Sequence, residues 1–150
     1  MARRPEPVRK SVKDTLEDLL AGHRDAVLGG PAAVVKYVSR VFEGQGNLPL
    51  AIRSVAYDRL AEAQAQLQDW EACVASVGLA IQHLPDMEAA FPHAHREMLL
   101  QLSCFERGIQ AHSQLGHFEE ALALAEQAVA LDLGAHYAAK RDSLAWAATR

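Results

Sequence analysis

The sequence predicts an all-α protein of about seven helices that pair into hairpins. Apolar residues recur at spacings of three and four along most of the chain, which is the period of an amphipathic helix. β-branched residues do not alternate with polar residues over a useful length, so no strand is predicted. One pattern also returns 48 residues later, because Gln66 and Leu67 are matched by Gln114 and Leu115.

The first two predicted helices cover residues 11–28 and 31–43. Ser11 is a good N-cap, and Asp14 three residues later strengthens the capping pattern. Gly29 and Gly30 end the first helix, and Pro31 suits the first turn of the second. We expect these helices to form a hairpin over residues 11–43.

A second hairpin is predicted over residues 48–85. Its first helix begins near Pro49 and ends near Leu67, and its second helix begins at Asp69. Pro85 is expected to stop that helix, because proline lacks the backbone N–H that a helix interior requires.

A third hairpin and a last helix complete the predicted fold. Pro92 pushes Phe91 out of helix geometry, and a fifth helix is expected over residues 92–115. Gly116 breaks it, and a sixth helix closes a hairpin over residues 92–132. The seventh helix, over residues 134–149, is expected to cap the stack.

Composition and charge predict one domain and a separate tail. A chain of 150 residues that is 50% hydrophobic suits a single modest core. Residues 1–10, MARRPEPVRK, hold four basic residues and one acidic residue, and we expect a basic disordered tail there. Since the whole chain has a formal charge of −4, residues 11–150 are acidic, which argues against nucleic-acid binding except through the tail.

The chain is expected to be cytoplasmic, with no membrane contact. It has no apolar run of 18 residues, and no apolar signal core follows the first ten residues. Cys73 and Cys104 show neither CxxC spacing nor a disulfide framework, which favours a reducing compartment and small core residues rather than reactive thiols.

The repeated pattern pairs an aromatic residue at the start of a helix with small residues further along it. Trp70 corresponds to Phe118 and Cys73 to Ala121. An aromatic side chain there wedges against the preceding helix, and a small one lets two helix backbones approach. Such hairpins cannot bury their apolar faces alone, so neighbouring hairpins stack.

Residues 56–85, AYDRLAEAQAQLQDWEACVASVGLAIQHLP, and residues 105–132, FERGIQAHSQLGHFEEALALAEQAVALD, resemble tetratricopeptide repeats. The matching residues are Tyr57, Leu60, Ala61, Trp70, Cys73, Val77, Ala80, Pro85, Phe105, Phe118, Ala121, Ala125 and Ala128. The resemblance implies a right-handed α-α superhelix of helical hairpins with a C-terminal capping helix.

Three departures from that family pattern stand out. The period is 48 residues, against about 34 in the family. We assign the excess to residues 86–97, as a connection, and to extra turns on the fifth helix. Gly108 and Ile109 stand where leucine and a small residue are expected, and Leu133 replaces a proline. Residues 11–43 resemble a third repeat only weakly.

The resemblance also implies a concave groove lined by the first helix of each hairpin. The residues that map to it are Asp58, Glu62, Gln66, Glu106, Gln110, Gln114 and Lys140. An acidic or polar groove favours a neutral or basic segment. Family members that grip acidic chaperone tails use Lys and Asn where this chain has Asp58 and Glu62, so that activity is not implied. The alternative is that these side chains only solubilise an exposed face.

No catalytic, cofactor or metal site is predicted. The HAH run at residues 93–95 lacks metal-ligand spacing, although His112 and His117 flank the Gly116 turn closely enough to approach each other. The expected function is therefore a non-catalytic adaptor that binds a peptide or helix of another protein, with possible self-association through the terminal helices. The alternatives are a regulatory component of transcription whose basic tail or partner contacts DNA, and an enzyme on a helical scaffold.

Overall fold

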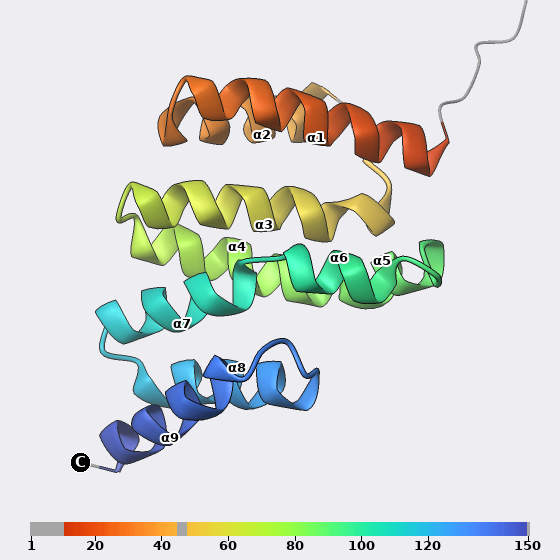
Figure 1. Cartoon of the computed structure of the whole chain (residues 1–150). Coiled ribbons are helices and arrows are strands. Elements are labelled where there is room, and N and C mark those ends of the chain that lie inside the picture. Colours follow the sequence, from red (N-terminus) through yellow and green to blue (C-terminus); the bar gives the residue numbers. More distant parts are fainter. Residues whose placement is uncertain (1–10, 45–47, 150) are drawn as a thin grey trace, which may run out of the picture.

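The computed structural model describes residues 11–44 and 48–149, which form nine helices arranged mainly in two layers (Figure 1). One layer holds α1 (Val12–Leu28), α3 (Leu50–Gln66), α7 (Cys104–Gln114) and α9 (His136–Ala148). Behind it lie α2 (Pro31–Gly44), α4 (Trp70–Gln82) and α8 (Phe118–Ala130). Two short helices, α5 (Leu84–Ala90) and α6 (His95–Gln101), join α4 to α7.

The predicted all-α class is confirmed, since the described residues contain helices and turns but no strand. Seven of the helices have 11 or more residues and correspond to the seven predicted ones. The predicted tail at residues 1–10 lies outside the described residues. Each helix from α1 to α4 packs on the next helix along the chain, and α7, α8 and α9 do likewise.

Local signals place the first hairpin as predicted. The Ser11 Oγ accepts a hydrogen bond from the Asp14 N–H at 3.1 Å, which satisfies a free amide at the start of α1. Gly29 follows the last residue of α1, and Gly30 has φ +93°, a conformation that L side chains rarely adopt. α2 then begins at Pro31.

The 48-residue repeat is present in the backbone. The Asp69 N–H donates to the Gln64 carbonyl at 2.9 Å, and the His117 N–H donates to the His112 carbonyl at 2.8 Å. In each turn the residue before this donor is left-handed, with φ 59° in the first and 77° in the second. The helices that follow, α4 and α8, both have 13 residues. The two hairpins are therefore closed by the same turn.

The small residues of the repeat are equivalent, but its aromatic residues are not. The side chains that were predicted to allow close packing are all at most 2% exposed: Cys73, Val77, Ala80, Ala121, Ala125 and Ala128. Trp70 packs against the core, whereas Phe118 is 38% exposed. Close helix approach is thus repeated, while the aromatic side chain is more buried in the α3–α4 hairpin than in the α7–α8 hairpin.

Two predicted helix boundaries are wrong. α4 ends at Gln82, and Pro85 lies in the first turn of α5, where its missing N–H costs nothing. The single helix predicted over residues 92–115 is two helices, because Leu102 is extended, at φ −79° and ψ 140°, between α6 and α7. Phe91 is outside helix geometry, as predicted, at φ −129° and ψ 58°.

The extra residues of the long period form α5 and α6. α5 packs beside α3. Arg96 of α6 donates from Nη1 to the Leu131 carbonyl at 2.5 Å and from Nη2 to the Asp132 carbonyl, both at the C-terminal end of α8. This contact satisfies carbonyls that the end of α8 leaves open and ties α6 to the α7–α8 hairpin.

Gly108 and Gly78 test how tightly the hairpins pack. A Cβ at Gly108 would lie 2.6 Å from Leu124 Cδ1 and 2.7 Å from Val77 Cγ1, whereas nothing lies within 4 Å of one at Gly78. We expect Gly78→Ala to stabilise the protein by about 0.5 to 1 kcal/mol, because alanine favours helix over glycine. Gly108→Ala should destabilise it by about 1 kcal/mol or more, because the stiff Val77 side chain cannot retreat.

The check is urea unfolding of both variants, with the midpoint compared with that of the unsubstituted chain. A Gly108→Ala midpoint equal to that of Gly78→Ala would show that α7 does not pack closely on α4.

Candidate functional site

Three connected hollows run along α3 on the layer that contains α1, α3 and α7. Their volumes are about 380, 440 and 270 Å³, and Arg59 lines all three. α1 forms one wall, α6 and Ser103 contribute to the other, and α3 supplies the floor. We call this surface the α3 groove.

A fourth hollow of about 630 Å³ lies between α7 and α9. Ile109 and Leu144 supply its apolar part, and Glu106, Gln110 and Lys140 supply its polar part. We call it the α7–α9 hollow.

The predicted groove residues fall into three groups. Glu62 and Gln66 line the α3 groove. Glu106, Gln110 and Lys140 line the α7–α9 hollow, and Gln114 is exposed outside the hollows described above. Asp58 is 0% exposed, so the prediction that it faces a partner is wrong.

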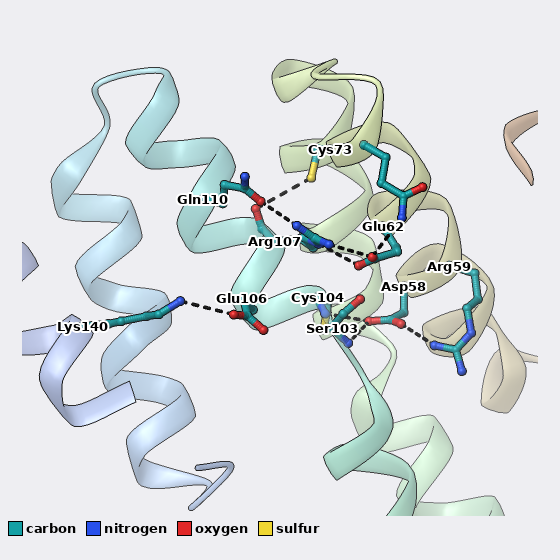
Figure 2. Close-up of polar contacts among 11 residues, drawn as sticks. Asp58, Arg59, Glu62, Cys73, Ser103, Cys104, Glu106, Arg107, Gln110 and Lys140 are labelled. Carbon is teal, nitrogen blue, oxygen red and sulfur yellow. Dashed lines mark hydrogen bonds and ion pairs between the residues drawn. The ribbon is translucent and has the colours of Figure 1, made fainter. Parts of the chain in front are cut away.

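The buried Asp58 carboxylate binds groups of the protein itself. Its Oδ1 accepts hydrogen bonds from the Ser103 N–H at 2.8 Å and the Cys104 N–H at 2.7 Å, and its Oδ2 accepts one from Arg59 Nη1 at 2.7 Å (Figure 2). Burial raises the pKa of Asp58, while the positive charge of Arg59 and the two backbone amides act in the opposite direction.

These contacts explain why the predicted fifth helix is broken. α7 begins at Cys104, and its first amides would be unsatisfied without an acceptor. The Ser103 side chain makes no capping hydrogen bond, and Asp58 supplies the acceptor from α3. A carboxylate at a helix N-terminus also interacts favourably with the helix dipole. The sequence around residue 103 gives no sign of this cap, because the capping residue, Asp58, lies 45 positions earlier in the chain.

Glu62 is bound by Arg107, a residue that was not predicted to line the site. Arg107 Nε donates to Glu62 Oε2 and Arg107 Nη2 donates to Glu62 Oε1, both at 2.7 Å, while Arg107 Nη1 donates to Gln110 Oε1 at 2.9 Å (Figure 2). The hydrogen bonds from Arg107 lower the pKa of Glu62, more than its partial burial raises it. This pair joins α3 to α7 where the α3 groove meets the α7–α9 hollow.

The α7–α9 hollow has a weaker polar contact. Lys140 Nζ lies 3.4 Å from Glu106 Oε1, and their side chains are 38% and 52% exposed (Figure 2). An exposed pair of this kind contributes little to stability, because water screens it. Both side chains are therefore free to exchange this contact for another.

The α3 groove is less acidic than the sequence indicated. Asp58 and Glu62 are each held by an arginine. Lys13 and Arg24, which line the groove, are exposed and form no ion pair within the described residues, and Glu17 lines it beside them. The prediction that the groove favours a neutral or basic segment therefore loses its basis.

The cysteines and histidines form no larger constellation. Cys73 and Cys104 are free and buried, and burial raises the pKa of both thiols, that of Cys73 to about 11. The rings of His112 and His117 approach to 5.9 Å, and the Nδ1 atom of His112 is buried without a hydrogen-bond partner. Over residues 11–44 and 48–149, no group of three or more potential metal ligands comes together.

Comparison of the chain with protein-family models, with curated proteins and with solved structures found no match. None of the helices described for this chain combines the length and the apolar character needed to cross a membrane.

The Asp58 cap gives a first test of the site. Asp58→Ala should destabilise the protein by about 3 kcal/mol, because two amides and a guanidinium lose a buried acceptor. Asp58→Asn should cost less, because its side-chain oxygen can still accept a hydrogen bond. The matched control is Asp69→Ala at the exposed N-cap of α4, where the loss should be about 1 kcal/mol.

Urea unfolding followed by far-UV circular dichroism measures these differences. Equal losses for Asp58→Ala and Asp69→Ala would contradict the structural role given to Asp58.

The Glu62–Arg107 pair predicts a pH dependence. Because the folded-state pKa of Glu62 is lowered from its ordinary value of 4.5, the pair stabilises the fold above that pH. The contribution is lost as the pH falls through the lowered value. We expect Glu62→Gln to cost about 1 kcal/mol near pH 7 and clearly less near pH 3.5.

Urea unfolding at both pH values tests this, with Glu97→Gln as the control. Glu97 is exposed on α6, and its substitution should have little effect at either pH. A cost for Glu62→Gln that does not change with pH would refute the linkage.

Proposed function

We propose that the chain is a non-catalytic adaptor of tetratricopeptide-like construction that binds a segment of another protein in the α3 groove. The shared turn at Gln64–Asp69 and His112–His117, together with the two equally long helices that follow, supports the repeat relationship. A right-handed superhelix and a cytoplasmic location belong to the same proposal.

The observation that carries the proposal is the continuity of the α3 groove. Its three hollows share Arg59, and they extend from Lys13 near one end of α1 to Gly30 beyond the other. α3 has 17 residues, so its length is about 25 Å, which an extended segment of about seven residues would span. A long open groove of this kind suits a chain segment better than a small compact ligand.

The arrangement of the layers supports binding on this side. The groove is built from α1, α3 and the α6–α7 segment, with Pro31 and Val34 of α2 lining one end, while α4 supports α3 from behind (Figure 1). The site is thus carried by helices whose positions are set by packing, which lowers the ordering cost of binding.

Gln66→Trp tests the proposal. Gln66 is exposed and lines the groove, so a tryptophan there should fill part of it without disturbing the core. Protein captured from an extract of the source cells should decrease about tenfold relative to the unsubstituted chain.

The matched control is Gln82→Trp, at an exposed position on α4 in the other layer. It should capture the same partner in the same amount as the unsubstituted chain. If both tryptophan variants retain the partner equally, while both unfold at the midpoint of the unsubstituted chain, binding does not use the α3 groove.

A further inference from the structure

We propose that the α3 groove selects a protein segment in which a bulky apolar residue is followed or preceded by acidic residues. The apolar side chain enters a pocket between α1 and α6, and the carboxylates lie against Lys13, Arg24 and Arg59. This inference rests on the proposed function and specifies its partner by chemistry.

The pocket for the apolar side chain is the 380 Å³ hollow, which we call the anchor pocket. Its apolar lining comes from four parts of the chain: Leu16, Leu20, Val55, Phe91, Met98 and Leu102. Burial of one leucine- or phenylalanine-sized side chain in such surroundings is favourable, because it removes apolar surface from water on both partners.

The insertion makes this pocket. Phe91 follows α5, Ala94 precedes α6, and Met98 lies within α6, so one wall consists of residues that the 48-residue period adds. The extra residues thus have a use beyond connecting α4 to α7.

The charges around the anchor pocket favour carboxylates. Lys13 stands at its rim, and Arg24 lines the adjoining hollow; neither forms an ion pair within the part of the chain that the structure describes. Arg59 lines both and gives only Nη1 to Asp58, so the other guanidinium nitrogens have no hydrogen-bond partner among described residues. Glu17 is the one carboxylate lining this part of the groove without an ion pair there.

The remaining acidic groups of this region do not change that balance. Asp58 is fully buried, and both oxygens of Glu62 accept from Arg107. Asp18 and Asp25 interact electrostatically with Tyr37 of α2, and neither lines the groove. A basic segment in the groove would therefore be repelled by the positive side chains there, and Glu17 would be the only unpaired carboxylate among the described residues of the groove available to attract it.

The positive charge of the groove also indicates whether a partner protein or the chain's own residues 1–10 would occupy it. Residues 1–10 hold four basic residues and one acidic residue, which is the wrong charge for a surface that offers Lys13, Arg24 and Arg59. We therefore assign the groove to another protein.

A displayed library of random peptides of about twelve residues, long enough to span the groove, tests the proposal with the full chain as target. Selection should enrich peptides that combine Leu, Ile, Phe or Trp with neighbouring Asp or Glu. Enrichment of basic peptides, of peptides without an apolar residue, or of none above the empty support would overturn the inference.

Two charge-reversal variants then test the position. Lys13→Glu with Arg24→Glu should weaken binding of the best selected peptide at least about tenfold, measured by fluorescence anisotropy. Lys36→Glu with Arg40→Glu changes the net charge equally at exposed positions on α2 and should alter binding by less than about twofold. Equal effects of the two variants would show that only the overall charge matters.

Methionine methyl NMR tests the anchor pocket directly. With ¹³C-methyl-labelled methionine, the selected peptide should shift the Met98 signal, assigned with Met98→Leu, and leave buried Met87 unchanged. An unmoved Met98 signal at saturating peptide excludes the pocket. If removal of residues 1–10 moves that signal without peptide, the chain's own segment is the occupant and the proposal is wrong.

The proposed function and this inference fail separately. A partner that Gln66→Trp releases, but that Lys13→Glu with Arg24→Glu leaves bound, would retain groove binding and refute the chemistry proposed here. If the Gln66→Trp variant captures the partner as well as the unsubstituted chain does, both proposals are wrong.

Discussion

The placement of Asp58 is the constraint on which the rest of this structure depends. A carboxylate that is fully buried on α3 must have every strong acceptor position satisfied, and two backbone amides and Arg59 do so. This requirement places the start of α7 against the middle of α3. It also holds Arg59 at the centre of the groove, so Asp58 links the position of the α7–α8 hairpin to the surface that we propose as the binding site.

Features with local causes could be predicted from the sequence, and features with distant causes could not. Ser11, Gly29, Pro31 and Gly116 mark helix ends through their own backbone preferences, and the structure has helix ends at these positions. The end of α6 at Gln101 has no such mark, because the cap of α7 comes from Asp58, in an earlier hairpin. Pro85 was misread because a proline that stops one helix equally well starts the next.

The sequence predicted several of the residues that line the site, but not which of their charges are paired with other side chains. The resemblance to tetratricopeptide repeats assigned Glu62 and Gln66 to a groove, and both line the α3 groove, but a resemblance cannot tell which charges are already paired. Arg107 comes from α7, and it binds Glu62 with two hydrogen bonds. Ion pairs therefore reduce the acidic character that the sequence predicted for the groove, although Glu62 and Gln66 do line it. The sequence match of Gln66 and Leu67 to Gln114 and Leu115 does correspond to a shared structure, because equivalent hydrogen bonds from Asp69 and His117 close the two turns.

The attachment of α6 bears on how the groove adapts to what it holds. Polar contacts secure the segment near both ends, through Arg96 at the C-terminal end of α8 and through Ser103 at Asp58, while no neighbouring helix backbone in the described structure runs closely along it. Leu99 in the middle of α6 is also buried in the core, so α6 cannot move outward without exposing apolar surface. The width of the groove is therefore coupled to the stability of the fold, because widening it at α6 would remove Leu99 from the core that the hairpins share.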